Sequence, residues 1–294
     1  MKKLLVPVDF SETSEAAVDF GIQLARRCGY EVHLLHVVDF SGSYEAMYAD
    51  TSTIQSFTEA VMTDMEIRME NLYRRVKVEG VKITTHLTTG TLVRDVRSFV
   101  QETEIDLIVM GTKGAKGQHK FFVGSNAEKI VRMVDCPILT IPSKMTIDGI
   151  RKFIVPIDTR EIRYSFLKEV SMFQQIFSAK MEFLWVKTPH DLENLELIRE
   201  EFNNLLDECG IANSSFRIIR DIFPQDGILA YAKQSSGDIL AMSTHSRKGL
   251  AHLFSGSTTE DVLNQAEIPL WSLKINEAED IINLESFQKL RVEQ

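Results

Sequence analysis

Short apolar runs alternate with amphipathic segments through the first half of the chain. Five apolar runs have the length of buried strands, at 3–8, 31–37, 81–87, 105–110 and 137–141. Four segments between them place apolar residues three or four positions apart, as on one face of a helix, at 14–28, 55–78, 91–102 and 125–134. Strands that alternate with crossover helices predict a parallel sheet covered on both faces.

The second half of the chain repeats this order. Strands are predicted at 152–157, 180–186, 216–222, 238–242 and 269–274. Helices are predicted at 163–178, 191–208, 226–235 and 257–265. The predicted fold class is therefore α/β, with two tandem five-stranded parallel-sheet domains of Rossmann-like type.

The two halves are related as copies of one unit. Leu-Leu-Val-Pro-Val-Asp at 4–9 matches Phe-Ile-Val-Pro-Ile-Asp at 153–158, an offset of 149 residues. The strand and loop that begin at Asp106 match those that begin at Asp238, an offset of 132. The second copy is therefore 17 residues shorter. We expect the loss in the segment that corresponds to 39–58.

The repeat predicts one domain at 1–143 and a second at 151–276. The linker between them is short, which favours two domains packed as a pseudo-dimer over two independent beads. A further homodimer is left open. The segment 277–294 carries Ile281, Leu284, Phe287 and Leu290 at a spacing of three. This C-terminal tail is expected to be a helix that lies on a domain or a partner, and a frayed terminus is the alternative.

The composition is that of an ordinary globular protein, with 44% apolar and 26% charged residues among 294. No run reaches the roughly 18–20 apolar residues of a membrane span, and the N-terminus has the pattern of a first strand instead of a signal peptide. The net charge of −9 argues against a nucleic-acid-coating protein. Three distant cysteines without CxxC spacing favour buried thiols in a reducing cytoplasm.

A glycine pattern typical of a phosphate cradle follows the fourth strand of the first copy. Gly111 and Gly114 come directly after the strand, and Gly124-Ser125 opens the next helix. Glycine lets a backbone approach a phosphate closely and permits positive φ, and the free N–H groups of a helix N-terminus attract anions. Lys113 could add a cation. An ordinary glycine-rich turn before a capped helix is the alternative.

Asp9 follows the first strand and would stand at the same end of the sheet, where ligands of open parallel sheets bind. Its carboxylate could accept hydrogen bonds from ribose hydroxyls or an adenine amine. The alternative is that Asp9 only caps the following helix, for which Ser11, Thr13 and Ser14 also offer oxygens. The chain has neither a G-x4-G-K-[ST] motif nor a G-x-G-x-x-G after strand one, which argues against a P-loop NTPase and a standard dinucleotide-binding dehydrogenase.

The sequence resembles the universal stress protein family in its tandem two-domain form, over nearly the whole chain. The resemblance is carried by Val-Pro-Val-Asp at 6–9, Val-Met-Gly-Thr-Lys-Gly at 109–114, Gly124-Ser125, and Cys-Pro-Ile-Leu-Thr-Ile at 136–141. It implies domains with strand order 3-2-1-4-5, usually paired. It also implies ATP binding where Gly-x2-Gly-x9-Gly-[Ser/Thr] is complete, as it is in the first domain.

The resemblance further implies a role for each matching residue around ATP, with or without Mg²⁺. The expected contacts are Pro7, Val8 and Asp9 at the adenine and ribose, Val37 at the adenine, Met110 and Gly111 at the pocket floor, and Lys113, Gly114, Gly124, Ser125 and Asn126 around the phosphates. Asn126 departs from the family, which commonly has valine there. Its amide either adds a phosphate contact or weakens the helix cap.

The second domain departs further from this pattern. Ser243 and Ser246 stand where the first domain has Gly111 and Gly114. Each serine adds a Cβ, and a positive φ would cost a non-glycine residue about 1–2 kcal/mol. The second site is therefore expected to be empty or weak.

Three functions agree with the sequence. The first is an ATP-binding stress-response or regulatory protein, with slow hydrolysis at most. The second is an interaction scaffold that binds no nucleotide, and the third is a weak ATPase. The first is favoured, because no metal-ligand cluster, base or positioned nucleophile stands beside the glycine pattern. The chain is expected to be more a binding protein than an enzyme, with no nucleic-acid or membrane partner.

Overall fold

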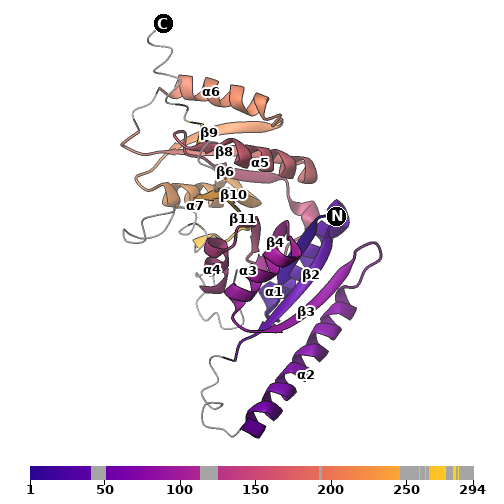
Figure 1. The fold of residues 1–294 in the computed structure, drawn as a ribbon. Helices are drawn as coiled ribbons and strands as arrows, with labels where there is room; N and C mark the ends of the chain where they lie inside the picture. Colours follow the sequence, from indigo (N-terminus) through magenta and orange to yellow (C-terminus); the bar gives the residue numbers. More distant parts are fainter. Residues whose placement is uncertain are drawn as a thin grey trace. The chain divides into compact units, whose positions relative to one another are not determined.

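The computed structural model describes residues 1–40, 51–112, 125–191, 194–245, 258, 262, 265–275, 281–282 and 284. The chain divides into two compact units, Met1–Met145 and Thr146–Gln294. Figure 1 shows their helices and strands, coloured along the sequence. Each unit holds one copy of the sequence repeat.

Strands and helices alternate in unit 1 in the order that the hydrophobic pattern predicts. The strands are β1 (Lys3–Pro7), β2 (Glu31–Val38), β3 (Ile83–Thr89), β4 (Leu107–Gly111) and β5 (Ile138–Ile141). The helices are α1 (Glu12–Cys28), α2 (Thr51–Val76), α3 (Leu92–Thr103) and α4 (Ser125–Met133). The ends differ from the predicted ones by a few residues, because local turns and caps decide where an element stops.

The strands of unit 1 lie in the order β3-β2-β1-β4-β5, and each neighbouring pair is parallel. β1 is central, and Leu4, Leu5 and Val6 are fully buried, as expected of a strand covered on both faces. The chain leaves β1 toward β2 on one side and later returns to β4 on the other side. The switch point of the sheet therefore lies between β1 and β4.

The helices of unit 1 cover both faces of its sheet. Helices α3 and α4 contact one another, while α1 packs on β1 and β4. Right-handed crossovers in this strand order place α1 and α2 on one face and α3 and α4 on the other. The core between them is built from the apolar runs of the strands, so the carboxyl edge of the sheet is left for the loops.

Unit 2 repeats this architecture with three small additions. Its main strands are β6 (Lys152–Pro156), β8 (Lys180–Lys187), β9 (Ser214–Arg220), β10 (Ile239–His245) and β11 (Leu270–Ile275). Its helices are α5 (Tyr164–Phe177), α6 (Leu195–Glu208) and α7 (Pro224–Ser235). The additions are the 3-10 turn η2 (Ile147–Gly149) and the two-residue strands β7 (Ile162–Arg163) and β12 (Ile281–Ile282).

The main strands of unit 2 lie in the order β11-β10-β6-β8-β9, the same order as in unit 1. The register repeats as well: Leu4 pairs with Leu107 in unit 1, and Phe153 pairs with Ile239 in unit 2. Leu4 and Phe153 are related by the offset of 149, and Leu107 and Ile239 by the offset of 132. Residues at corresponding sequence positions therefore occupy corresponding places in the two sheets, which allows the two candidate sites to be compared residue by residue.

The length difference between the copies lies where a helix and its preceding connection are shorter. Helix α2 has 26 residues and α6 has 14. The loop before α6 is also the shorter of the two. The expected loss in the segment that corresponds to 39–58 agrees with these bounds.

Two expectations for the C-terminal part fall partly outside the described residues. Of the helix expected over 257–265, residues 258, 262 and 265 are described and are helical. Of the tail expected to be helical, Ile281 and Ile282 form strand β12 instead, and Leu284 is in helical conformation. Strand pairing with β7 replaces the expected helix at Ile281 and Ile282.

The described helices include none that is long and apolar enough to cross a membrane. Cys28, Cys136 and Cys209 are free thiols. Burial, with a smaller contribution from the charge of Asp106, raises the pKa of Cys136 to about 12. This thiol is therefore neutral at physiological pH and belongs to the core.

Candidate functional site

The carboxyl ends of β1 and β4 bring Asp9 and Gly111 to the same place, around the N-terminus of α1. The Asp9 N–H donates to Ser14 Oγ at 3.4 Å. A Cβ added to Gly111 would lie 2.9 Å from Ser14 N. Ser14 in the first turn of α1 thus lies beside both residues, as the expectation of a site at the switch point requires.

Asp9 is exposed, and Ser11, not Asp9, is the N-cap of α1. The Ser11 side chain accepts a hydrogen bond from Ser14 N at 3.2 Å, as capping residues do. The Asp9 carboxylate accepts the Ser11 N–H at 3.0 Å through Oδ1. The loop therefore fixes the position of Asp9 while its side chain faces solvent, which suits a carboxylate that binds a polar ligand group.

Gly111 has a structural reason to be glycine that differs from the expected one. Left-handed φ angles occur at four described glycines, and Gly111 is not among them. Its position in β4 instead presses it against α1, because an added Cβ would lie 2.7 Å from the carbonyl carbon of Thr13. Real Cβ atoms do not approach backbone so closely. The glycine serves a close contact between strand and helix.

An aromatic group beside Asp9 was not found from the sequence. Phe10 has a left-handed φ of 59°, and its ring centroid lies 4.9 Å from that of His36. His36 Nδ1 lies 2.7 Å from Val8 O and must donate its proton, because a carbonyl oxygen only accepts. The guanidinium carbon of Arg68 lies 5.8 Å from the Phe10 ring. An aromatic residue directly after Val-Pro-Val-Asp was the available signal.

The other expected contacts of unit 1 are placed as follows. Pro7, Val8 and Met110 are buried in or at the end of their strands, Val37 is half-buried in β2, and Asn126 is exposed in the first turn of α4. Ser125 is the first residue of α4. Lys113, Gly114 and Gly124 lie outside the described residues. The structure thus describes the residues expected at the nucleoside end, and Ser125 and Asn126 of the phosphate end; that they contact a nucleotide stays a prediction.

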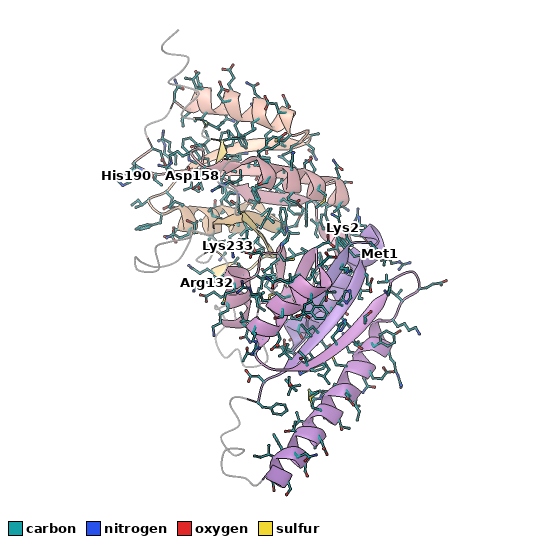
Figure 2. All side chains as sticks on the ribbon, in the orientation of Figure 1. Met1, Lys2, Arg132, Asp158, His190 and Lys233 are labelled. Carbon is teal, nitrogen blue, oxygen red and sulfur yellow. The ribbon has the colours of Figure 1, made fainter. Side chains whose placement is uncertain are left out.

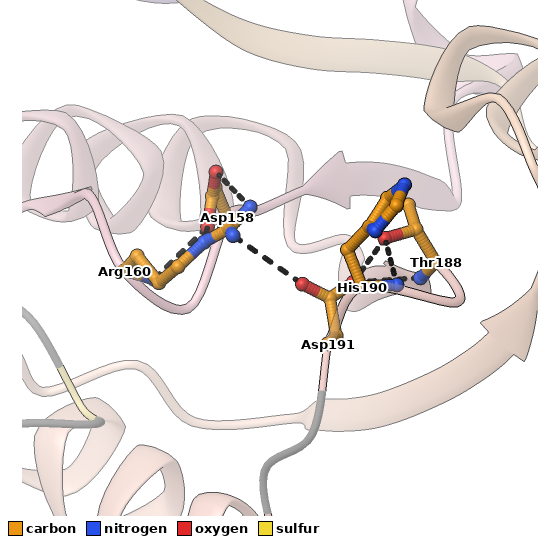
Figure 3. Close-up of polar contacts among 5 residues, drawn as sticks. All are labelled: Asp158, Arg160, Thr188, His190 and Asp191. Atoms are coloured by element: carbon orange, nitrogen blue, oxygen red, sulfur yellow. Dashed lines mark hydrogen bonds and ion pairs between the residues drawn. The ribbon is translucent and has the colours of Figure 1, made fainter.

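In unit 2, the residue that corresponds to Asp9 is held by an arginine. Asp158 lies after β6, and its Oδ1 accepts Arg160 N at 3.0 Å and Arg160 Nε at 3.1 Å. Arg160 Nη2 donates to Asp158 Oδ2 at 3.3 Å. Both carboxylate oxygens are therefore engaged by one guanidinium, the geometry in which arginine binds carboxylates most specifically. Figure 3 shows this pair.

The same arginine reaches the loop after β8. Arg160 Nη1 lies 3.4 Å from Oδ1 of Asp191, whose side chain is 2% exposed. Asp191 Oδ2 accepts the N–H of Thr188 at 2.6 Å and its hydroxyl at 2.9 Å, and Thr188 Oγ1 accepts His190 N at 3.3 Å. Figure 2 shows Asp158 and His190 near one another on unit 2. Arg160 thus bridges the loops after β6 and β8.

Arg160 corresponds to Ser11, the N-cap of α1, so the two loops use one position for different purposes. In unit 1 this position caps a helix, and in both units the aspartate side chain is exposed. In unit 2 it neutralises the aspartate with a cation. The exchange of serine for arginine at the offset of 149 was visible in the sequence, but only the structure shows where the guanidinium goes.

Among the residues that the structure describes, no group of three or more His, Cys, Asp or Glu side chains is arranged to hold a metal ion.

The family model described as "Universal stress protein family" matches residues 1–142 and again 150–274. Universal stress protein MJ0531 of Methanocaldococcus jannaschii is 29% identical over 140 residues, which are 48% of this chain and 81% of that protein. Universal stress protein YxiE of Bacillus subtilis is 26% identical over 144 residues, which are 47% of this chain and 97% of that protein.

Solved structures resemble the chain over its length. A universal stress protein from Archaeoglobus fulgidus has a TM-score of 0.69 at 16% identity and covers 92% of this chain and 98% of its own. A putative universal stress protein from Pseudomonas aeruginosa has a TM-score of 0.69 at 15% identity and covers 100% of this chain and 98% of its own. At such identities the likeness shows the fold alone: α/β with two tandem domains.

Proposed function

The chain belongs to the universal stress protein family, and on that premise we propose that its N-terminal domain is a binding site for one adenine nucleotide, ATP. The C-terminal domain leaves its corresponding site without nucleotide. The protein then acts as a nucleotide-responsive regulator in the stress response. This proposal rests on the contrast between two aspartates at corresponding positions.

That contrast is the observation that carries the proposal. Asp9 is exposed at the switch point and held in place by the Ser11 N–H. Asp158 has both carboxylate oxygens bound by Arg160. A ribose that approaches Asp158 would have to displace a charge-assisted pair, which is stronger than a neutral hydrogen bond. Asp9 accepts the Ser11 N–H through Oδ1, and its side chain is exposed.

The aromatic rings beside Asp9 support an adenine at the nucleoside end. Phe10 and His36 lie next to one another, and a purine can stack or pack edge-on against such rings. Val37 follows His36 in β2 and adds an apolar contact. The base is therefore proposed to lie near the ends of β1 and β2.

The phosphate end of the proposal rests on the sequence. Gly111, Gly114 and Gly124-Ser125 keep the complete spacing of the ATP-binding branch, and Ser125 begins α4. A helix N-terminus offers free N–H groups and positive potential to phosphates. With Asp9 at the nucleoside end, the nucleotide would run from β1 toward α4.

Equilibrium titration of the full-length protein with ATP tests the proposal. Two matched variants, Asp9→Asn and Asp158→Asn, remove one charge at corresponding positions. We expect Asp9→Asn to weaken ATP binding by about tenfold or more, because hydrogen bonds to charged groups contribute about 1.5–3 kcal/mol. Asp158→Asn is expected to leave the affinity unchanged.

Repeating the titration with EDTA and with Mg²⁺ separates binding of free ATP from binding of its magnesium complex. If the unmodified protein binds no ATP at millimolar concentration, the nucleotide proposal is wrong and the scaffold function takes its place. Equal weakening by the two variants would contradict the assignment of the site to the N-terminal domain.

A further inference from the structure

Two parts of unit 2 that are far apart in the sequence lie side by side. Strand β12 pairs antiparallel with β7, with Ile281 opposite Arg163 and Ile282 opposite Ile162. The N–H of Leu284 donates to Thr159 O at 2.9 Å. Leu284 is 2% exposed and Ile162 is 3% exposed. Residues 281, 282 and 284 are therefore docked, by backbone pairing and by the buried side chain of Leu284, on the segment that follows β6.

The place where the tail docks corresponds to the first turn of a helix in unit 1. At the offset of 149, Ile162 and Arg163 correspond to Thr13 and Ser14. Those two residues are helical, because α1 begins at Glu12. Helix α5 begins only at Tyr164. Unit 2 thus lacks the helical turn that unit 1 has here, and has an extended segment in its place.

Ser243 gives a physical reason for the missing turn. Gly111 packs so closely on the first turn of α1 that an added Cβ would lie 2.7 Å from the Thr13 carbonyl carbon and 2.8 Å from its oxygen. Ser243 stands at the corresponding position in β10 and carries this Cβ. A helical turn placed as in unit 1 would collide with it. The backbone at Ile162 and Arg163 must therefore take another course.

An extended segment at this place needs hydrogen-bond partners. In unit 1 the Ser11 side chain accepts the Ser14 N–H of the first helical turn, whereas the extended segment of unit 2 must find backbone partners in another segment. Strand β12 supplies backbone partners to β7 by antiparallel pairing. The Leu284 N–H donates to Thr159 O in the same segment. The apolar side chain of Leu284 is removed from water in the same contact, which favours docking.

We propose that the carboxyl-edge loop of the C-terminal domain is a peptide-binding site whose occupant is the chain's own C-terminal segment, through residues 281, 282 and 284. The ligand class is an extended apolar segment that binds by strand addition. Ser243 creates the site by excluding the helical turn, and the tail fills it. The site that binds nucleotide in the proposed function of the first domain is thus replaced in the second by an intramolecular peptide site.

Amide hydrogen exchange in the full-length protein tests this proposal. Leu284→Asp places a charge in the buried contact and should accelerate exchange in 159–163 by at least about tenfold, because local opening sets the exchange rate. Leu284→Ala should give a smaller increase. The corresponding segment 10–14 of the first domain is the internal reference and should not change.

Two additions make the result specific. A synthetic peptide with the sequence of residues 277–294 should restore protection of 159–163 in the Leu284→Asp protein. In that same background Ser243→Gly should also restore part of it, because the helical turn can then form. Ser272→Gly, at a buried serine of the neighbouring strand β11, is the matched control and should restore none.

If Leu284→Asp unfolds the whole unit, shown by fast exchange in β8 as well, the Leu284→Ala protein gives the answer. Unchanged exchange in 159–163 in that variant would overturn the proposal. Protection that depends on protein concentration would show that the strand comes from a second copy of the chain, and would overturn the intramolecular assignment. Failure of ATP to bind has no bearing on these outcomes, so the two proposals fail separately.

Discussion

Gly111 at the end of β4 packs directly against the backbone of Thr13 in the first turn of α1. A Cβ at position 111 would lie 2.7 Å from the Thr13 carbonyl carbon. The strand and the helix N-terminus therefore fit together only because residue 111 has no side chain. This contact holds the loop that carries Asp9 in place.

Gly111→Ala is expected to destabilise the N-terminal domain by about 1–3 kcal/mol, because the new methyl group meets backbone that cannot move aside cheaply. The urea-unfolding midpoint measures the loss. Gly149→Ala is the control, since a Cβ there would lie 3.5 Å from Thr146 Oγ1, an ordinary contact. Equal midpoints for the two variants would contradict the close packing of Gly111.

Phe10→Ala is expected to weaken ATP binding by about two- to tenfold, because an aromatic contact contributes about 0.5–1.5 kcal/mol. The same titration as for Asp9 measures it. Phe223→Ala in the second domain is the control, because this ring is 56% exposed and lies in the unit assigned no nucleotide. An unchanged affinity of the Phe10→Ala protein for ATP would show that the Phe10 ring does not contact the nucleotide.

Tyr231→Phe is expected to destabilise the C-terminal domain. The Tyr231 hydroxyl donates to Glu182 Oε1 at 2.6 Å, and Glu182 is 4% exposed. Burial opposes the charge of Glu182, but the bond from Tyr231 and the nearby cations, among them Lys152, leave its pKa lowered. Removing the hydroxyl leaves a buried carboxylate with one partner fewer, which costs about 1–3 kcal/mol.

Tyr164→Phe in the same unit is the control for this change. The Tyr164 ring lies beneath Lys168, and no hydrogen bond of its hydroxyl is found within the described part of the chain. Chemical unfolding of both variants measures the difference. If Tyr231→Phe lowered the free energy of unfolding no more than Tyr164→Phe, the hydrogen bond from the Tyr231 hydroxyl to Glu182 would not stabilise the domain.

Two histidines of the first domain should make its stability depend on pH. His33 Nδ1 lies 3.0 Å from His86 Nε2, and Phe99 packs against both rings. Burial lowers the pKa of both histidines, while the charge of Glu31 opposes the shift. Each histidine therefore binds its proton less readily in the folded chain than in the unfolded chain.

The direction of the pH dependence of stability follows from this difference in proton binding. As the pH falls below about 6.5, the unfolded chain takes up protons first, so the free energy of unfolding decreases by at most about 1.4 kcal/mol per pH unit for each histidine. His86→Gln keeps a hydrogen-bonding side chain but does not titrate, and should flatten the decrease between pH 7.5 and 5.5. His190→Gln, at an exposed histidine, should not. If the free energy of unfolding of His86→Gln fell as steeply between pH 7.5 and 5.5 as that of the unmodified protein, His86 would not be a source of the pH dependence.

The sequence predicted the elements of the fold well, because the apolar runs of β1 and β6 and their helical neighbours are strongly periodic. The two repeat offsets, found in the sequence, also relate the strand pairs Leu4–Leu107 and Phe153–Ile239 of the structure. These features depend on local pattern and on burial, both of which a single sequence displays.

The features that the sequence did not predict depend on contacts between residues far apart in the chain. β7 and β12 have two residues each, too few for any periodicity to show. The reason for glycine at Gly111 lies in the backbone of α1 at Thr13, far earlier in the chain. The pairing of Arg160 with Asp158 needs a rotamer that no sequence pattern specifies. At all three places tertiary packing decided the outcome.

A crystal structure of the full-length protein grown with ATP would show directly which of the two aspartates binds nucleotide. We expect one nucleotide per chain, with its ribose at Asp9 and its phosphates toward α4. We also expect Arg160 to remain on Asp158 with no nucleotide beside it. Nucleotide density at both aspartates, or at Asp158 alone, would contradict the account.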